Sequence, residues 1–285
     1  VNGIETGTVR TLKQVRAESK PCAFFVNGLD KEQADFAAVL DDLQQNYGAT
    51  AVIPFTVPVG AQDTLSGVAR VLGEADAADD VAAGYKETLM DAVAESDEEL
   101  MMKYLDGEEL TEEEVSQGLH AAIQSGDIVP VFCGSVSGDV GVDELMNGIA
   151  NLFPPPTAST YVRGEEPRTP SADGDALALV FKSVNDPFMG QLTYFRVYDG
   201  TFAAEADIHN LTQSNRERFG NLLRICGKQQ DSVDKALPGE IVAVAKLKDT
   251  HICDTLSSSS SPSQTLPTIT FPQPTMSFAV YAETK

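Results

Sequence analysis

The residues with the most specific chemistry stand in the segment 25–30, FVNGLD, where a short apolar run leads into an amphipathic helical pattern. A carboxylate at such a strand end can accept two hydrogen bonds from a nucleobase edge that carries two adjacent N–H donors. Guanine has this edge and adenine lacks it, so Asp30, with Asn27 fixing the loop, predicts a guanine site. The simpler interpretation is local structure, because Asn-Gly is a common turn pair and Asp30 with Gln33 makes an ordinary helix N-cap pair.

A second loop strengthens the guanine hypothesis. Residues 131–136, VFCGSV, again end an apolar strand and precede a helix. Ligands of open α/β sheets bind at the carboxyl ends of the strands, where backbone N–H groups around Ser135 can donate to a guanine oxygen. We therefore expect Asn27, Asp30 and Ser135 in one small pocket, with Asp30 and Ser135 within about 15 Å. The alternative is a plain strand-to-helix connection.

The machinery for nucleotide phosphates is missing from the sequence. No G-x-x-x-x-G-K-[ST] motif occurs, since Gln229 follows the Gly227-Lys228 pair, and no D-x-x-G follows an apolar strand. Phosphoryl transfer depends on such a cradle and on the magnesium ion that it holds. We expect this chain alone to contain no catalytic residue, to need no cofactor, and neither to bind GTP tightly nor to hydrolyse it.

Cysteine and histidine spacing predicts no metal site. No CxxC or HExxH pattern occurs, and a zinc site needs about four clustered ligands. The widely spaced cysteines instead suggest free thiols in a reducing compartment. These residues are Cys22, Cys133, Cys226, Cys253, His120, His209 and His251.

Charge is distributed unevenly over the 285 residues, whose net charge is −23. Residues 1–153 hold 28 acidic and 8 basic residues, whereas residues 154–285 hold 15 and 12. The first part repels phosphate backbones, so any RNA contact should belong to the second. No apolar run reaches the roughly 18 residues of a membrane span, and neither a membrane nor DNA is expected as a partner.

Periodicity divides the chain at Pro154-Pro155-Pro156. Before this point short apolar strands alternate with helices, as in a largely parallel sheet covered on both faces, and after residue 175 short strands and turns indicate a small β-barrel. A capping box opens the helix that follows Thr111. The expected strands are 21–26, 51–57, 128–133, 176–184, 192–198 and 240–247, and the expected helices are 31–47, 81–96, 98–105, 111–123 and 142–153.

Several long segments resemble the elongation factor G family of translational GTPases. Gly28 departs from the lysine of the family's N-K-x-D motif, and Cys253 stands where glycine is usual. The segment between residues 59 and 80 is short for the family, which together with Gly28 favours a diverged paralogue. The similar segments are 1–10, 25–30, 98–105, 107–111, 130–142, 152–156, 186–201, 216–224, 247–256 and 268–285.

This resemblance implies an α/β plus β-barrel fold: part of a P-loop-GTPase-type parallel sheet, then a translation-factor-type antiparallel barrel. Residues 1–156 would be the C-terminal part of a GTP-binding domain with a shortened inserted subdomain, and 157–175 an irregular linker. Residues 176–256 would be a closed barrel, 257–264 a Ser-rich linker, and 265–285 the first strand of a truncated third domain. On this basis the chain is expected to be an internal piece of a longer protein.

The resemblance also implies a function. The parent would be a cytoplasmic, ribosome-associated GTP hydrolase that drives translocation in protein synthesis with GTP or GDP and Mg²⁺, and its barrel would contact small-subunit ribosomal RNA. Two alternatives stay open: a noncatalytic ribosome-docking module, and a ribosomal-protection or release-factor-type GTPase. Four cations of the second half are either a solvated strand face or a phosphate-contacting edge, namely Arg216, Arg218, Arg224 and Lys228.

Overall fold

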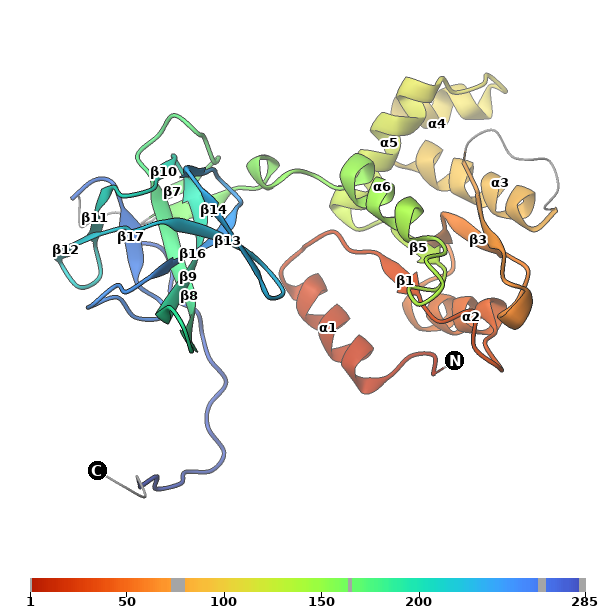
Figure 1. Ribbon diagram of the computed structural model, residues 1–285. Coiled ribbons are helices and arrows are strands. Elements are labelled where there is room, and N and C mark those ends of the chain that lie inside the picture. Colours follow the sequence, from red (N-terminus) through yellow and green to blue (C-terminus); the bar gives the residue numbers. More distant parts are fainter. Residues whose placement is uncertain (1, 73–79, 164–165, 261–264, 282–285) are drawn as a thin grey trace. The chain divides into compact units, whose positions relative to one another are not determined.

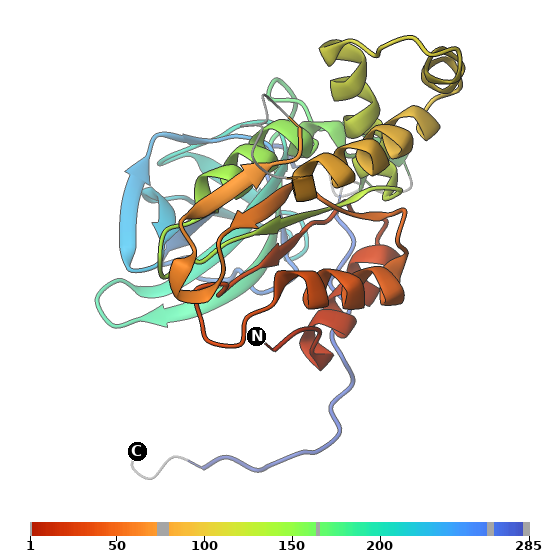
Figure 2. The same cartoon turned by 90° about the vertical axis from the view of Figure 1, so that its right-hand side faces the viewer.

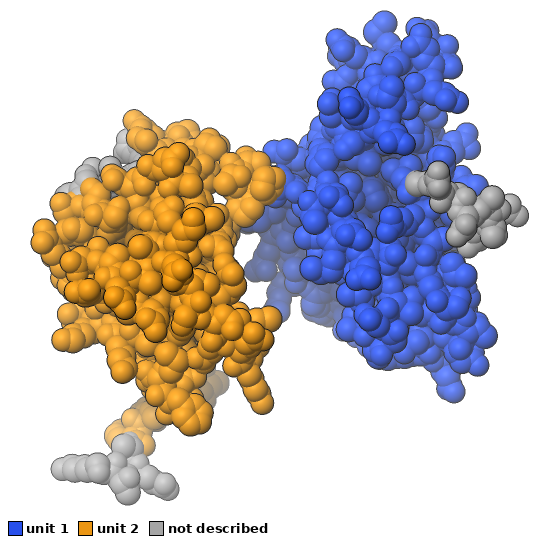
Figure 3. Space-filling model, turned by 45° about the horizontal axis from the view of Figure 1, so that its top comes forward, with its two compact units in different colours: residues 1–154 blue, residues 155–285 orange. Residues whose placement is uncertain are grey.

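The computed structural model describes residues 2–72, 80–163, 166–260 and 265–281 (Figure 1). The chain forms two compact units, Val1–Pro154 and Pro155–Lys285 (Figure 3). Each unit is built around its own apolar clusters. None of the helices within the described ranges is long and apolar enough to cross a membrane.

A three-stranded parallel sheet forms the centre of the first unit. Its order is β1 (Phe24–Val26), β5 (Val129–Cys133), β2 (Val52–Pro54). Leu40 and Leu43 of helix α2 (Phe36–Tyr47) pack on one face, and helices α3 (Asp80–Glu95), α5 (Glu112–Ser125) and α6 (Val142–Leu152) cover the other (Figure 2). Coverage on both faces explains why β5 is apolar at every position, so the prediction of a parallel sheet between helices is confirmed.

Helix α2 begins later than the sequence pattern predicts. Residues 31–34 instead form turns, in which Lys31 N–H donates to Gly28 C=O and Ala34 N–H to Lys31 C=O. The N-cap is Asp35, whose carboxylate accepts from Ala38 N–H at 3.0 Å. The prediction of an Asp30 N-cap is therefore wrong, and the Asp30 side chain is left for another role.

The expected strand 51–57 divides at its proline. Pro54 has no N–H for a ladder, and after Phe55 N–H has donated to Val131 C=O the chain leaves the sheet. It continues as β3 (Thr56–Val59) in a hairpin with β4 (Gly67–Arg70), with the short 3₁₀ helix Gln62–Thr64 between them. Helix α1 (Thr6–Ala17) was not predicted, because only Leu12 of its face is buried.

Three helices follow residue 80: α3 (Asp80–Glu95), α4 (Glu98–Leu105) and α5 (Glu112–Ser125). The predicted capping box is confirmed, since Thr111 and Glu114 satisfy each other's backbone N–H groups. Lys103 Nζ lies 2.7 and 2.9 Å from the two carboxylate oxygens of Glu114. Hydrogen bonds from Lys103 and then from Thr111 lower the pKa of Glu114 to about 2. Helix α6 (Val142–Leu152) ends the unit.

The lowered pKa of Glu114 makes a pH prediction for the start of α5. A depressed carboxyl pKa contributes stability that is present above the unfolded value and is lost as pH falls through the folded one. We expect the Glu114 carboxyl to titrate near pH 2 by carbon-13 NMR, and the first turn of α5 to fray between about pH 4.5 and 2. Lys103→Met should move the titration upward. A Glu114 midpoint unchanged by Lys103→Met would contradict the assigned cause.

The second unit is dominated by one antiparallel sheet of eight strands, ordered β12-β11-β17-β8-β9-β16-β13-β14. The sheet curls around the stacked rings of Phe195 and Phe219 and the adjoining ring of Phe202. Its strands are β8 (Leu177–Asp186), β9 (Gly190–Asp199), β11 (Asp207–Asn210), β12 (Asn215–Arg218), β13 (Leu222–Cys226), β14 (Gln229–Val233), β16 (Ile241–Ala245) and β17 (Thr255–Ser257).

The curled sheet is barrel-like, but its end strands do not pair. Among the described residues β12 and β14 form no ladder with each other, so the predicted antiparallel barrel is confirmed as a barrel-like sheet that is not closed through its end strands. Short strands β10 (Phe202–Ala203) and β15 (Lys235–Ala236) pair separately. Their continuation, in which Ala204 N–H donates to Asp234 C=O and Glu205 N–H to Gly220 C=O, ties the two halves of the sheet together.

Residues 155–175 are more ordered than the irregular linker that the sequence predicts. A 3₁₀ turn (Pro156–Ala158) precedes the hairpin of β6 (Tyr161–Arg163) and β7 (Glu166–Arg168). Tyr161 Oη donates to the buried carboxylate of Asp199 at 2.6 Å, across 38 residues of chain. Sequence spacing contains no signal for this contact. The hydrogen bond attaches the β6–β7 hairpin to strand β9 of the large sheet.

The serine run also differs from expectation. Ser257 is fully buried at the end of β17, and Ser258 exchanges hydrogen bonds with Ala176, so the sheet extends beyond residue 256. The serine-rich stretch 261–264 lies outside the described residues, as do 282–285. Within 265–281 no strand forms, contrary to the predicted first strand of a third domain. Leu266, 5 % exposed, is the point where this tail packs on the unit.

Candidate functional site

The loops that follow β1 and β5 are joined by hydrogen bonds. These strands are neighbours, with Val26 paired to Cys133, so the chain leaves both at the same edge of the sheet. Gly134 N–H donates to Val26 C=O at 3.0 Å, and Leu29 N–H donates to Gly134 C=O at 3.2 Å. Two segments more than 100 residues apart in sequence thus form one surface.

Asn27 links the two loops through its side chain. Its Oδ1 accepts a hydrogen bond from Val136 N–H at 3.0 Å. This contact has the loop-fixing role that the sequence analysis assigns to Asn27. Its partner in the second loop is the residue after Ser135.

Asp30 lies beside this junction and has an unsatisfied oxygen. Backbone lengths and the Leu29–Gly134 hydrogen bond place the Cα atoms of Asp30 and Ser135 within about 11 Å. Asp30 Oδ1 is buried and has no hydrogen-bond partner among the residues that the structure describes. Since a buried acceptor without a partner costs roughly 1–3 kcal/mol, such an atom in a loop suits a ligand that brings its own donor.

Ser135 is placed differently from the expectation. It is fully buried, its N–H donates to Val140 C=O at 2.9 Å, and its Oγ accepts from Gly138 N–H at 3.1 Å. Its own N–H therefore is not available to a ligand. Among the backbone N–H groups of residues 135–138, that of Ser137 is the one without an acceptor in the described part of the chain. Sequence reasoning missed Ser137, because the loop's internal hydrogen bonds carry no sequence signal.

A hollow of about 280 Å³ opens next to the same loop. Asn27 and Lys31 line it together with β1 and residues 2–5, but Asp30 and Ser135 do not. The structure thus brings the three predicted residues to one edge of the sheet without placing all of them in a single hollow.

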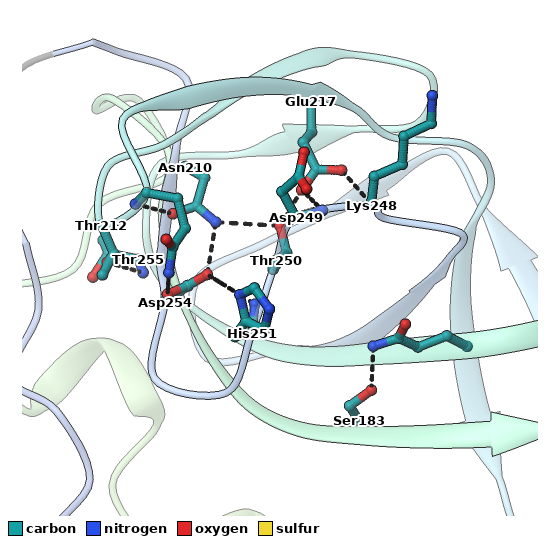
Figure 4. A network of polar contacts seen from close by, with 12 residues as sticks. Ser183, Asn210, Thr212, Glu217, Lys248, Asp249, Thr250, His251, Asp254 and Thr255 are labelled. Carbon is teal, nitrogen blue, oxygen red and sulfur yellow. Dashed lines mark hydrogen bonds and ion pairs between the residues drawn. The ribbon is translucent and has the colours of Figure 1, made fainter.

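A second candidate surface lies on the barrel, where two carboxylates hold the loop after β16 (Figure 4). Asp254, 2 % exposed, accepts from His251 N–H and Asn210 Nδ2, both at 2.8 Å. Glu217 of β12 accepts from Lys248 N–H at 2.6 Å and from the hydroxyl of Thr250. The loop is thereby held in one conformation.

The same loop contains the family's usual glycine position. Cys253 has φ +74°, a left-handed conformation that glycine adopts without strain. This geometry explains the glycine that the family resemblance leads one to expect there. Cys253 N–H donates to Val180 C=O at 2.8 Å, which holds the strained residue in place.

This held loop presents cations outward. The Lys248 side chain points away from the network, and the His251 side chain is 70 % exposed (Figure 4). Arg216 and Arg218 are exposed on the adjoining strand β12 and take part in no ion pair among the described residues. Arg224, by contrast, pairs with Glu240. The cationic edge of this surface comprises Arg216, Arg218 and Lys248, of which Lys248 was not among the predicted residues. Of the other predicted cations, Arg224 is neutralised by Glu240, and Lys228 is exposed in the turn between β13 and β14.

Neither metal nor thiol chemistry is indicated. The described ranges contain no group of three or more His, Cys, Asp or Glu side chains that could hold a metal ion. All four cysteines are free. Burial raises the pKa of the Cys133 thiol to about 12, so that this residue is an inert part of the core.

Comparison with known proteins connects these units to translation. Residues 175–259 match the sequence family described as elongation factor G domain 2. A crystal structure of a protein from Thermus thermophilus superposes on 96 % of this chain with a TM-score of 0.80 and 26 % sequence identity. The chain spans 42 % of the length of that structure. Residues 175–259 of the second unit are therefore similar to elongation factor G domain 2, and the fold of the chain is similar to that of the Thermus thermophilus protein.

Proposed function

We propose that this chain is the base-binding and ribosome-docking part of a cytoplasmic translational GTPase of the elongation factor G type. In the first unit Asp30 would accept the N–H donors of the guanine edge, while Ser137 N–H would donate to its carbonyl oxygen. The cationic edge of the barrel would contact small-subunit ribosomal RNA. The phosphates of GTP or GDP and the Mg²⁺ ion would be held by residues outside this chain.

One observation carries the guanine assignment. The buried, unpartnered Oδ1 of Asp30 lies beside two loops that hydrogen bonds fasten together. A carboxylate can pair with N1–H and the 2-amino group of guanine, whereas adenine offers neither donor in that position. Because Asn27 links the two loops, this geometry exists before a base binds. Little conformational entropy of the loops is therefore lost on binding.

Binding of nucleosides tests the proposal directly. We expect guanosine at millimolar concentration to shift the amide resonances of residues 29–31 and 135–138, and adenosine to leave them in place. Asp30→Asn exchanges one acceptor for a donor, so it should favour xanthosine, which has a carbonyl in place of the 2-amino group. Guanosine that shifts neither loop, or that binds Asp30→Asn unchanged, would refute the assignment.

The same titration with GTP addresses the missing phosphate motif. Without a phosphate cradle GTP should bind no more tightly than guanosine, and no phosphate should be released above the buffer rate. Micromolar GTP binding or turnover would show that this chain holds the phosphates by other residues.

RNA docking through the barrel makes a separate prediction. Each lost phosphate contact should reduce the slope of log affinity against log salt by about one. We therefore expect Arg216→Ala with Arg218→Ala to weaken binding to isolated small ribosomal subunits and to flatten its salt dependence. Arg168→Ala, which removes an exposed arginine already paired with Glu166, is the matched control. Equal loss in both variants would exclude β12 as the contact.

Gly28 favours a second candidate function. In the N-K-x-D motif a lysine covers the base, and Gly28 stands at that position without a side chain. This replacement fits a chain that docks on the ribosome and does not use nucleotide. On that hypothesis small-subunit binding persists while guanosine produces no shifts. The two assays together separate the alternatives.

A further inference from the structure

The space above Gly28 is occupied by a lysine from three residues along the chain. Gly28 has φ +77°, and its C=O accepts a hydrogen bond from Lys31 N–H at 3.2 Å, which closes a turn. A Cβ at residue 28 would lie 3.5 Å from both Cδ and Cε of Lys31 and 3.8 Å from its Nζ. Apart from residues 27–29, the three atoms nearest to that position all belong to Lys31. Its alkyl stem therefore lies beside Gly28, in van der Waals contact with the position where a side chain at residue 28 would begin.

The Lys31 side chain is also available to a ligand. It is exposed, and among the described residues its ammonium group takes part in no hydrogen bond or ion pair. Lys31 lines the hollow of about 280 Å³ that Asn27 also lines. A lysine can lay its methylene groups along an apolar surface while its ammonium stays in water, and a cation gains further from a π face.

We propose that Lys31 is a positioning residue for the nucleobase, whose alkyl stem covers one face of the purine in place of a side chain at residue 28. This inference rests on the proposed guanine site. Residues 27–31 would then divide the work: Asn27 fastens the loops, Asp30 binds the base edge and Lys31 covers the ring. Gly28 permits this arrangement, because it adopts the left-handed turn and leaves its own side-chain position empty.

Contact of Lys31 with the ring face predicts a different effect on binding from contact of Asp30 with the base edge. Stacking against a face does not depend on the 2-substituent, so loss of Lys31 should weaken purine binding and leave the guanosine-to-xanthosine preference unchanged. Loss of the Asp30 carboxylate should alter that preference instead. A merely structural Lys31 would move neither quantity.

The experiment titrates guanosine and xanthosine into the full chain and into Lys31→Ala, Lys31→Met and Lys20→Ala, with amide shifts of residues 29–31 and 135–138 as the readout. We expect Lys31→Ala to weaken guanosine binding about three- to fivefold, the scale of burying roughly one methylene group of the stem against an apolar face. Lys31→Met keeps the stem and should stay within about twofold of the unsubstituted chain. Lys20 is exposed beyond the end of α1 and supplies the charge-matched control.

The outcomes separate this inference from the function on which it rests. Guanosine binding that is equal in the unsubstituted chain and in Lys31→Ala overturns the role of Lys31 and leaves the guanine site standing. Equal loss in Lys31→Ala and Lys31→Met overturns the stem contact, because the ammonium would then be the group that matters. An unsubstituted chain that shows no shifts with guanosine overturns both the site and the cover.

Discussion

Gly141→Ala should destabilise the first unit by about 3 kcal/mol or more, since a new methyl group would overlap the backbone. Gly141 precedes helix α6 with φ +75°, and a Cβ there would lie 2.1 Å from the carbonyl oxygen of Cys133. Cys133 is the last, fully buried residue of β5. The nearest atoms, which belong to Cys133 and Gly134, are backbone atoms, so either the end of β5 or the start of α6 must move. The left-handed φ adds strain for any residue with a side chain.

The substitution Gly141→Ala should also disturb the loop that contains Ser135 and Val136. The turn 135–140 is closed by the mutual hydrogen bonds of Ser135 and Val140, directly before Gly141. A shift of Gly141 separates these groups and takes Val136 away from Asn27. We expect the Val136 amide to lose its protection from hydrogen exchange. Helical circular dichroism in urea measures the stability loss, because the α-helices of the described residues belong to the first unit.

Gly138→Ala is the control for this prediction. It lies in the same turn, but a Cβ there would have as its nearest atoms Ser135 Oγ at 3.5 Å, Ser135 Cβ at 3.7 Å and Val140 Cγ2 at 3.9 Å, all of which are ordinary contacts. It should cost less than about 1 kcal/mol. If the two variants unfold at the same urea concentration, the prediction is wrong. The backbone around Gly141 would then move aside at a free-energy cost no larger than that at Gly138.

Asp199→Ala should destabilise the second unit by about 3 kcal/mol, because it removes a buried acceptor shared by the Tyr161 hydroxyl and the Ser171 N–H, while Gly200 N–H keeps its bond to Ser171 C=O. The Asp199 side chain accepts from Tyr161 Oη at 2.6 Å, Ser171 N–H at 2.8 Å and Gly200 N–H at 3.1 Å. Asp199 is 6 % exposed and Tyr161 7 %, so water has little access to replace the carboxylate at the Tyr161 hydroxyl. The segment 155–175 is expected to detach from the sheet.

Hydrogen exchange in the second unit measures this effect. We expect amides of β6 and of Ser171 to lose protection first, followed by β9 when the unit opens. Tyr161→Phe removes one donor and keeps the ring contact with Tyr198, so it should cost only about 1–2 kcal/mol. Asp207→Ala, at an exposed position of β11, should change little. Unchanged β6 exchange in Asp199→Ala would show that the linker is held by its apolar contacts alone.

Local signals in the sequence predicted much of this structure correctly. The apolar run 129–133 marked a strand buried on both faces, and Thr111 with Glu114 marked the start of α5, because each pattern arises from neighbours along the chain. The change of periodicity at residue 154 matched the boundary between the two units. Such features depend on the periodicity of buried residues and on helix capping, and both are set by residues that are close in sequence.

Local rules failed where two choices were nearly equal in energy. Asp30 and Asp35 are both suitable N-caps, and the tertiary structure decided for Asp35, because the preceding turn holds Gly28 and Lys31 beside the second loop. The strand after Ala51 stops pairing with β5 at Pro54, the interruption that the proline itself indicates, and the tertiary structure added the hairpin of β3 with β4. For the N-cap, contacts with a distant segment settled the outcome.

The sequence by itself determined the types of element, the unequal charge of the two halves and the identity of the carboxylate at the end of β1. Only the tertiary structure decided that Asn27 binds Val136, that the N–H of Ser135 is already taken, that Tyr161 reaches Asp199, and that Lys31 lies over Gly28. The physical reason is that periodicity and capping act over one or two turns of chain. Hydrogen bonds and side-chain cover depend on where separate loops meet, which the folding of the whole unit sets.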